Sequence, residues 1–327
     1  MIDSLADQAA AARHRAALFD VSDRTQFELR GRDRAKFLHS FCTNDIQNLP
    51  EGQGCEAFLL NVMGRMLGHV AVFAAADALW VDGVPGQETA LIAHLDKYLI
   101  REDVEFVAHS ADYGELWLAG PEVLGLLTAV LGIGDLSAEE LLTQQTLHWQ
   151  GTSLWLRRID WLGAPGWLVS GPQAAVDGLR QALVSHGVTT GSPEVLESLR
   201  IEAGYPVYGR DLSAENLAQE AARTPRSISF RKGCYLGQEP VARLDALGHT
   251  NKELRRLKWA GTTVPPAGTA IFDPTGAIPA GVITSAAPVY DATEPTVAAI
   301  AFVKTKWNGA GGQVRVGENT AEVVGGE

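Results

Sequence analysis

The stretch Lys232-Gly233-Cys234-Tyr235-Leu236-Gly237-Gln238-Glu239 combines a thiol, a cation, an amide, a carboxylate and two glycines, and Arg231 precedes it. Glycine permits turns with positive φ and lets a ligand approach the backbone closely. A cation beside a thiol favours the thiolate, which is the reactive form of cysteine. We therefore predict that Cys234 is a functional thiol. The alternative is a small buried apolar residue, which is the commoner role of a lone cysteine.

The same stretch resembles the K-G-C-Y-x-G-Q-E signature of the YgfZ-type folate-binding proteins, which are relatives of the glycine-cleavage T-protein, an aminomethyltransferase. Val241-Ala242-Arg243 and Asn251-Lys252 continue the resemblance, which extends from about residue 15 to the C-terminus. It implies an α+β fold in two parts. Residues 1–248 would form a T-protein-like body of two interleaved lobes around a central folate cavity, and residues 249–327 a small C-terminal β-barrel.

The charge of the chain argues against one class of partner. The formal net charge is -12, so we expect no strong binding of nucleic acid through the overall field. Between residues 223 and 258, however, nine cations accompany only three acids. This basic segment is either an ordinary solvated face or an attraction for an anionic ligand, such as the glutamate tail of a folate. On the second alternative we predict Arg231, Lys232 and Arg243 as cofactor-binding residues.

The three cysteines, Cys42, Cys55 and Cys234, are widely spaced and form no C-x-x-C pair. The spacing typical of zinc and self-contained iron–sulfur sites is absent, so we predict no metal site. An odd number of cysteines without a disulfide framework suits a reducing compartment. The polar, acidic N-terminus does not resemble a signal peptide, and no run of about 18 apolar residues could span a bilayer. We expect a cytoplasmic protein without membrane association.

Hydrophobic periodicity predicts three units in which a strand, a glycine and a helix follow one another. The strands fall at 26–29, 115–119 and 166–170, and the helices at 33–41, 123–131 and 174–184. A capped, alanine-rich helix is predicted from Asp3 or Ser4 to about Ala17. Further short strands and a helix at 89–99 lie between the first two units. From Trp259 onward, short strands at 270–272, 281–283, 297–301 and 312–316 predict a small barrel that begins near His249.

Glu202 and Asn44 are the other predicted ligand contacts. Glu202 lies in the last turn of a helix that Gly204 ends, where the helix dipole disfavours a carboxylate. The resemblance implies that this glutamate binds the pterin ring, whose amino-pyrimidinone edge can donate two parallel hydrogen bonds to a carboxylate. Asn44 belongs to Thr43-Asn44-Asp45, which matches a T-N-D element of the family. The alternative role of Asn44 is to stabilise a turn.

One segment departs from the T-protein pattern. T-proteins carry an acidic pair after a G-G-I-x-D-D turn, and its aspartate assists attack on the aminomethyl donor. Gly68 and His69 stand at those positions here, in a segment that matches the G-[KR]-M form of YgfZ-like proteins. Glycine cannot exchange a proton, and a lone histidine on a strand is more often a packing residue than a base. Aminomethyl transfer is therefore disfavoured.

Three functions stay open on the sequence. The first is a folate-binding accessory protein that supports the assembly, maintenance or repair of iron–sulfur enzymes, including those that modify tRNA. Cys234 would be its working thiol, tetrahydrofolate or a derivative its cofactor, and iron–sulfur enzymes or assembly factors its partners. Such a protein is not a classical enzyme. The second is a tetrahydrofolate-dependent one-carbon transferase, and the third a structural or RNA-associated module that uses the basic segment.

Overall fold

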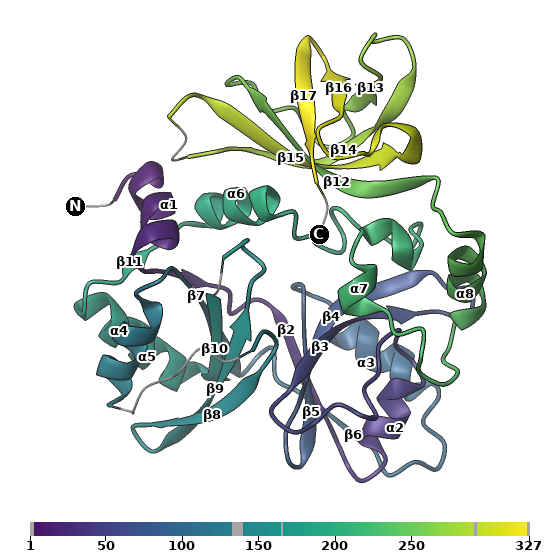
Figure 1. Cartoon of the computed structure of the whole chain (residues 1–327). Helices are drawn as coiled ribbons and strands as arrows, with labels where there is room; N and C mark the ends of the chain where they lie inside the picture. Colours follow the sequence, from purple (N-terminus) through teal and green to yellow (C-terminus); the bar gives the residue numbers. More distant parts are fainter. Residues whose placement is uncertain (1–2, 133–139, 165, 291–292, 326–327) are drawn as a thin grey trace.

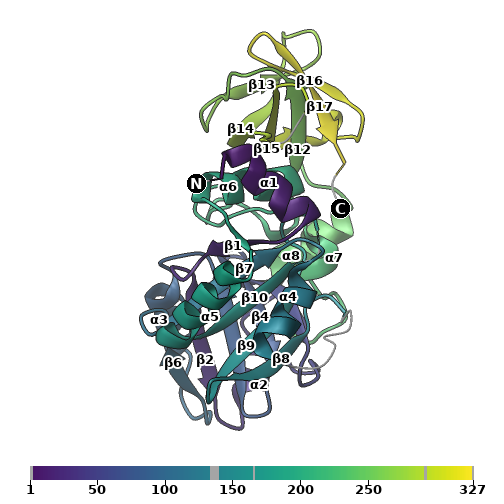
Figure 2. The same cartoon turned by 90° about the vertical axis from the view of Figure 1, so that its left-hand side faces the viewer.

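The computed structural model describes residues 3–132, 140–164, 166–290 and 293–325. Two lobes lie side by side and a barrel covers the junction between them (Figure 1). A view turned by 90° shows helices α1 and α6 between the lobes and the barrel (Figure 2). Within the described residues the structure therefore has the architecture predicted from the sequence, with two lobes and a C-terminal barrel.

The first lobe is a six-stranded sheet in the order β11-β1-β7-β10-β9-β8. Its strands are β1 (Ala17–Asp20), β7 (Tyr113–Ala119), β8 (Gln144–Trp149), β9 (Thr152–Ile159), β10 (Gly166–Pro172) and β11 (Thr189–Thr190). Helices α4 (Val123–Leu131) and α5 (Gln173–Ser185) pack on one face. The helices follow β7 and β10 in the chain, as the second and third strand–glycine–helix units predict.

The second lobe is a five-stranded sheet in the order β3-β4-β5-β2-β6. Its strands are β2 (Thr25–Arg30), β3 (Gly54–Leu60), β4 (Met66–Ala74), β5 (Ala78–Gly83) and β6 (Glu105–Ala108). Helices α2 (Arg34–His39) and α3 (Glu88–Asp96) cover its apolar face. The chain leaves the first lobe after β1, completes the second, and returns at β7, so the two lobes are interleaved as expected.

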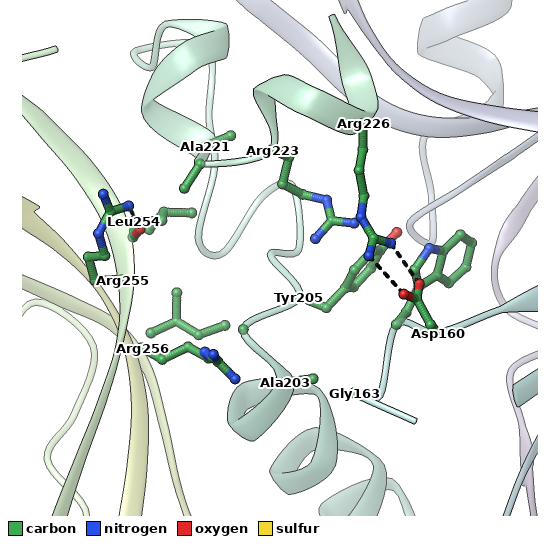
Figure 3. A pocket seen from close by; sticks show the side chains of 14 residues that line it. Asp160, Gly163, Ala203, Tyr205, Ala221, Arg223, Arg226, Leu254, Arg255 and Arg256 are labelled. Carbon is green, nitrogen blue, oxygen red and sulfur yellow. Dashed lines mark hydrogen bonds and ion pairs between the residues drawn. The ribbon is translucent and has the colours of Figure 1, made fainter. Parts of the chain in front are cut away.

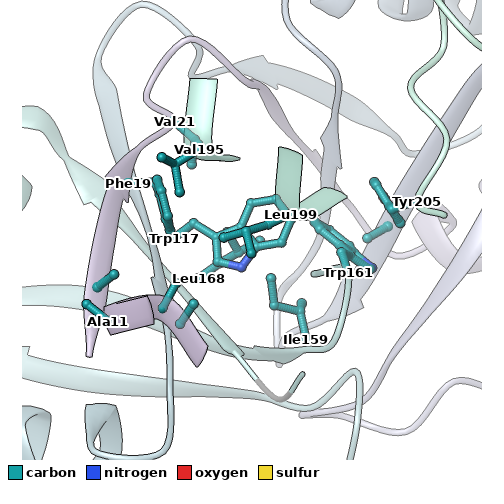
Figure 4. Packing of buried hydrophobic residues seen from close by; sticks show 14 of the residues in the cluster. Ala11, Phe19, Val21, Trp117, Ile159, Trp161, Leu168, Val195, Leu199 and Tyr205 are labelled. Carbon is teal, nitrogen blue, oxygen red and sulfur yellow. The ribbon is translucent and has the colours of Figure 1, made fainter. Parts of the chain in front are cut away.

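A continuous core joins the first lobe to the helices below the barrel. It contains α1 (Leu5–His14) and α6 (Pro193–Ala203), which pack small and aliphatic side chains against aromatic residues of the sheet (Figure 4). Trp117 and Trp161 meet edge to face at 5.5 Å between ring centroids, and Trp161 stacks on Tyr205 at 4.9 Å. This aromatic row carries the core toward the centre of the molecule.

The barrel closes in the order β12-β15-β14-β13-β16-β17. Its strands are β12 (Lys252–Ala260), β13 (Ala270–Phe272), β14 (Pro279–Pro288), β15 (Thr296–Lys304), β16 (Gln313–Val316) and β17 (Asn319–Val324), with the short 3₁₀ turn η2 (Thr305–Trp307). Side chains of a strand alternate between its two faces, and both faces of β15 are buried. Val297, Ala299 and Ala301 face the barrel interior, whereas Ile300 and Phe302 face the body.

Short elements connect the body to the barrel: η1 (Ala218–Ala221), α7 (Thr224–Ser227) and α8 (Gln238–Leu247). Buried Asp211, in the turn after α6, also links the two parts. Its Oδ2 accepts a hydrogen bond from Arg200 Nη1 at 2.6 Å, and its Oδ1 accepts one from Ser285 Oγ of β14 at 2.7 Å. Strand β12 starts at Lys252, and the predicted domain boundary at residue 248 stays a prediction.

Element ends differ from the predictions where tertiary pairing intervenes. Ser4 caps α1 as predicted and forms a capping box with Asp7, but the helix ends at His14. The predicted end at Ala17 is wrong because Ala17 already belongs to β1, where it pairs with both Ala119 and Thr189. Strand β12 was not predicted as a whole because its charged residues alternate irregularly with its buried ones.

Candidate functional site

A pocket of about 240 Å³ lies where the first lobe, the end of α6, the η1–α7 connection and the barrel meet (Figure 3). Four segments supply its walls: the turn after β9, the end of α6, the η1–α7 connection and strands β12 and β15. The lining residues are Asp160, Trp161, Gly163, Ala203, Gly204, Tyr205, Ala221, Ala222, Arg223, Arg226, Leu254, Arg255, Arg256 and Ile300. The sequence predicts a central cavity, and this pocket has the corresponding place in the fold.

Helix α6 positions one wall through local chemistry. Ser192 caps the helix, Pro193 occupies its first turn, and Gly204 ends it in the left-handed conformation at φ 77°. Both the helix and its end were predicted. Arg256 of β12 packs against Gly204, where a Cβ would lie 2.7 Å from the arginine side chain. Glycine is therefore needed for the barrel to approach α6 this closely.

Glu202 precedes this end of α6 but is not among the residues that line the pocket. Its Oε1 accepts hydrogen bonds from Arg13 Nη2 at 2.7 Å and from Ser198 Oγ at 3.2 Å. The arginine of α1 thus compensates the carboxylate at the unfavourable end of the helix dipole. Contact between Glu202 and a pterin stays a prediction, and the structure gives this side chain a role in joining α1 to α6.

Below the pocket lies a buried carboxylate that the sequence analysis did not identify. Glu56 of β3 accepts hydrogen bonds from Arg223 Nε at 2.6 Å and from Trp161 Nε1 at 3.3 Å, and His69 Nε2 lies 3.0 Å from its Oε2. We call Glu56, His69, Trp161 and Arg223 the Glu56 cluster. Burial alone would raise the pKa of Glu56, but the hydrogen bond with His69 and the charge of Arg223 hold it well below its usual range.

His69 occupies the place at which the resemblance leads one to expect an acid. It lies on β4 directly opposite Phe58 of the paired strand β3, two positions along that strand from Glu56. Its ring is buried between Phe58 and Tyr205, at 5.0 and 5.6 Å between centroids. The carboxylate near this position is therefore Glu56. Because its pKa is low and Arg223 already neutralises it, Glu56 is a weak proton acceptor.

The pocket itself combines cations with aromatic rings. Arg226 forms two hydrogen bonds of 2.8 Å with the carboxylate of Asp160, as Figure 3 shows. The guanidinium of Arg223 lies 5.2 Å above the ring of Tyr205, which in turn stacks on Trp161. Such a surface suits a flat aromatic ligand that carries an acidic group. Asp160 and Trp161 were not identified from the sequence because their partners lie more than forty residues away.

Asn44 and Thr43 connect strand β3 to helix α7 through hydrogen bonds. Asn44 Nδ2 donates to the carbonyl oxygens of Glu56 and Arg226 at 2.8 and 2.7 Å. Thr43 Oγ1 donates to the carbonyl of Ser227 at 2.5 Å. Since both hydrogens of the Asn44 amide are used, the structure supports the turn-stabilising alternative. The T-N-D segment places α7, and hence Arg223, over β3.

Lys232 is buried and has a similar structural role. Its Nζ donates to the carbonyl oxygens of His39, Cys42 and Asn44 at 2.5, 2.7 and 2.8 Å. An ammonium has three donors, so none is left for an anionic ligand. The predicted contact of Lys232 with a cofactor is therefore corrected, because burial directs its ammonium to the loop at 39–44 and not to the thiol of Cys234.

Cys234 is exposed in the loop between α7 and α8. Arg231, Glu239 and Arg243 are exposed as well, and Tyr235 is buried, which raises the pKa of its hydroxyl to about 12. These residues do not line the central pocket. Thus the predicted thiol is accessible, and its role and those of Arg231 and Arg243 stay predictions.

The two glycines of the motif differ. Gly237 has φ 78°, and a Cβ there would lie 2.4 Å from the carbonyl oxygen of Asn61. Glycine is therefore required at 237 both for its positive φ and for the close approach of another backbone segment. Gly233 is not in the left-handed region, and a Cβ there would meet open space. Gly233 thus needs neither positive φ nor close backbone contact, contrary to the prediction.

The basic segment does not form one surface. Its cations are Arg223, Arg226, Arg231, Lys232, Arg243, Lys252, Arg255, Arg256 and Lys258. Lys232 is buried outside the pocket lining, whereas Arg223, Arg226, Arg255 and Arg256 line the pocket. Over the residues that the structure describes, no group of three or more metal-ligating side chains is present, and no helix is long and apolar enough to cross a membrane.

This chain matches a family domain and known proteins with similar sequences. A family model described as the GCVT N-terminal domain matches residues 1–224. A chloroplast protein of Arabidopsis thaliana named as a transferase is 29% identical over 75% of this chain and 57% of its own length. The aminomethyltransferase of Prosthecochloris aestuarii is 26% identical over 71% of this chain and 66% of its own. The chain thus spans less than two thirds of either relative.

Among solved structures, the glycine cleavage system aminomethyltransferase T from Bartonella henselae superposes with a TM-score of 0.86. The match covers 98% of this chain and 88% of that one at 22% sequence identity. At this identity the likeness concerns the fold. It confirms the predicted T-protein-like arrangement of two lobes and a barrel.

Proposed function

Because the chain belongs to the family of the GCVT N-terminal domain, we propose that it binds tetrahydrofolate or a derivative in the central pocket. We further propose that it is of the YgfZ type: an accessory protein for the assembly, maintenance or repair of iron–sulfur enzymes, with Cys234 as the working thiol. The observation that carries the folate proposal is the stacked pair Trp161–Tyr205 beside Arg223 and Arg226. A pterin is flat and aromatic, and the folate tail is anionic.

Two observations favour an accessory role over aminomethyl transfer. Gly68 and His69 stand where the catalytic acids are expected, and Glu56, the buried carboxylate next to His69, has a lowered pKa and hydrogen-bonds with His69, Arg223 and Trp161. A low pKa makes a poor general base at neutral pH. In addition, the exposed position of Cys234 lets a partner protein reach the thiol without entering the pocket.

Folate binding is tested by isothermal titration with 5-formyltetrahydrofolate. Arg226→Gln removes a pocket cation that is only partly buried, so the variant should fold. It should weaken binding about tenfold, as expected for the loss of a charge-assisted hydrogen bond of 1.5–3 kcal/mol. The matched control is Arg231→Gln, an exposed arginine outside the pocket lining, which should leave the affinity unchanged.

If Arg231→Gln weakened binding and Arg226→Gln did not, the ligand would bind at the 231–239 loop and not in the pocket, as predicted for Arg231 from the sequence. Absence of saturable binding by the wild type would contradict folate binding altogether.

The role of the thiol is tested in cells that lack the native protein. We would measure a tRNA-thiolating iron–sulfur enzyme under oxidative stress, with wild type, Cys234→Ala and Cys55→Ala at equal expression. Rescue should be lost with Cys234→Ala only, because Cys55 is largely buried and burial raises its thiol pKa. Full rescue by Cys234→Ala would rule out the thiol role.

A tetrahydrofolate-dependent one-carbon transferase is the second candidate, favoured by the names of the relatives. It predicts that purified protein forms methylenetetrahydrofolate from a small amine donor. Absence of product over a series of glycine-derived amines would count against it. Formation of product that Glu56→Gln abolishes would support it over the accessory role.

A further inference from the structure

A second and larger cavity, of about 830 Å³, lies between the first lobe and α6. It shares a single lining residue, Tyr205, with the central pocket. Its volume is within the range of small-molecule sites, about 300–1,000 Å³. The proposed folate site does not use it.

The walls of this cavity are mainly apolar. Phe19 and Trp117 come from the first lobe, Leu196 from α6, and Tyr205 and Tyr208 from the turn after α6. Four of these five side chains are aromatic. Leu196 and Tyr208 are half-buried and offer apolar surface to a ligand with a hydrocarbon or ring-shaped body, whereas Phe19, Trp117 and Tyr205 belong to the buried core behind them.

Arg24 supplies a buried cation to the same cavity. The residue is 8% exposed. Its Nε and Nη2 donate to Asp82, and Nε also lies 3.3 Å from Glu115. Its Nη1 has no hydrogen-bond partner among the described residues, although Arg24 lines the cavity. A guanidinium carries donors on all three nitrogens, so one edge of Arg24 is available to a ligand.

Charge balance around Arg24 favours an anion. Arg24 and Arg157 face the carboxylates of Asp82 and Glu115, and we call these four residues the Asp82–Glu115 cluster. Burial and the charge of Asp82 raise the pKa of Glu115 well above its ordinary value. The cluster therefore carries less negative charge beside Arg24 than two ordinary carboxylates would.

The other charged groups of the cavity wall are exposed to solvent or form ion pairs. Asp20 Oδ1 accepts from the backbone and hydroxyl of Ser22. Glu197 is bound by Arg200 and Arg210, and Asp23 is exposed. Among the described lining residues, Arg24 is thus the buried cation with an unused donor nitrogen.

We propose that this cavity binds a small organic carboxylate whose acid group pairs with Nη1 of Arg24 and whose apolar body lies against Leu196 and Tyr208, next to Tyr205. The ligand class is a monocarboxylic acid with an aromatic or aliphatic body. The shared residue Tyr205 brings this ligand next to the occupant of the central pocket, because one ring borders both.

The probes for the test are 3-phenylpropanoate and its neutral counterpart, 3-phenylpropan-1-ol, measured by ligand-observed NMR titration of the full chain. The wild type should bind the carboxylate at least tenfold more tightly than the alcohol. Arg24→Lys should lose most of this preference, because lysine offers one point charge and cannot serve Asp82 and a ligand from two edges at once. Arg32→Gln, at an arginine that does not line the cavity and whose side chain is 82% exposed, should keep it.

A second variant covers the case in which Arg24→Lys does not fold. Thr190 lines the cavity and is exposed, so Thr190→Trp should fill the cavity at little cost in stability. It should weaken both probes at least tenfold and leave 5-formyltetrahydrofolate binding unchanged. Equal binding of acid and alcohol by the wild type, no saturable binding of either, or unchanged binding in Thr190→Trp would each overturn the proposal, whatever the outcome for folate.

Discussion

The Glu56 cluster and the Asp82–Glu115 cluster place the same residue type in the same degree of burial with opposite results. Glu56 and Glu115 are both fully buried, yet the pKa of Glu56 is lowered and that of Glu115 raised. Glu56 is the sole carboxylate among its partners and receives hydrogen bonds from Arg223, His69 and Trp161. Glu115 shares two arginines with a second carboxylate, Asp82. Burial raises the pKa of both glutamates, so the opposite net shifts come from their partners: Glu56 has His69 and Arg223, whereas Glu115 also faces the carboxylate of Asp82.

The largest expected effect is the loss of the cation from the first cluster. Arg223→Ala should destabilise the protein by about 3–5 kcal/mol, because it leaves Glu56 buried and charged without its main partner. Urea unfolding monitored by circular dichroism measures this. Arg226→Ala is the control, since its pair with Asp160 is partly exposed and should contribute about 1 kcal/mol or less. Equal losses in the two variants would mean that burial of Glu56 is not what makes Arg223 important.

A smaller effect is expected when the second cluster is made to resemble the first. Asp82→Asn removes the competing carboxylate, so the pKa of Glu115 should fall and Glu115 should ionise between Arg24 and Arg157. We expect a loss of about 1–3 kcal/mol, since Arg24 keeps a hydrogen-bond acceptor but loses a charge-assisted bond. Infrared difference spectroscopy should show the signal of a protonated carboxyl in the wild type and its loss in Asp82→Asn. Persistence of that signal would show that burial alone holds the proton.

The smallest effect at neutral pH is expected for Glu115→Gln, because the amide has the shape of a glutamic acid and burial and Asp82 raise the pKa of Glu115. We expect a change of about 1 kcal/mol or less at pH 7. The pH profiles should differ more. A raised pKa contributes stability that is complete below the ordinary glutamate value of 4.5 and is lost as the pH rises through the folded-state value. Glu115→Gln should therefore remove part of the loss of stability on the alkaline side.

Glu56→Gln should act on the opposite side. A lowered pKa contributes stability that is present above 4.5 and is lost as the pH falls. The variant should therefore be less sensitive to acid than the wild type. Unfolding curves between acid and weakly alkaline pH compare the two variants directly, and the same pH dependence in both would remove the distinction between the clusters.

The sequence predicts what depends on neighbouring residues. The capping box at Ser4, the helix end at Gly204 and the strand–glycine–helix units all use contacts within a few positions, and the structure confirms them. Four of the six barrel strands follow from apolar alternation and turn residues in the same way, whereas β12 and β17 were not predicted. The interleaving of the lobes and the folate-type cavity came from the resemblance to a family, and not from local patterns.

The site depends on distant contacts, which local patterns do not contain. Glu56 meets Arg223 across 167 positions, and Lys232 meets Asn44 across 188. Proximity in sequence suggested that Lys232 acts on Cys234; in space its ammonium binds the loop at 39–44. Glu56 was not predicted as a site residue. A single glutamate in an apolar strand indicates that a buried partner exists, but the sequence does not identify that partner.

The position of Tyr205 limits how this protein can change over evolution. One phenol ring borders the central pocket and the second cavity and also contacts Trp161 and His69. A substitution that adapts either cavity to a new ligand would reshape the other at the same time. The two cavities therefore lack independent mutational routes at this residue, and descendants that change one specificity through Tyr205 must accept or compensate a change in the second.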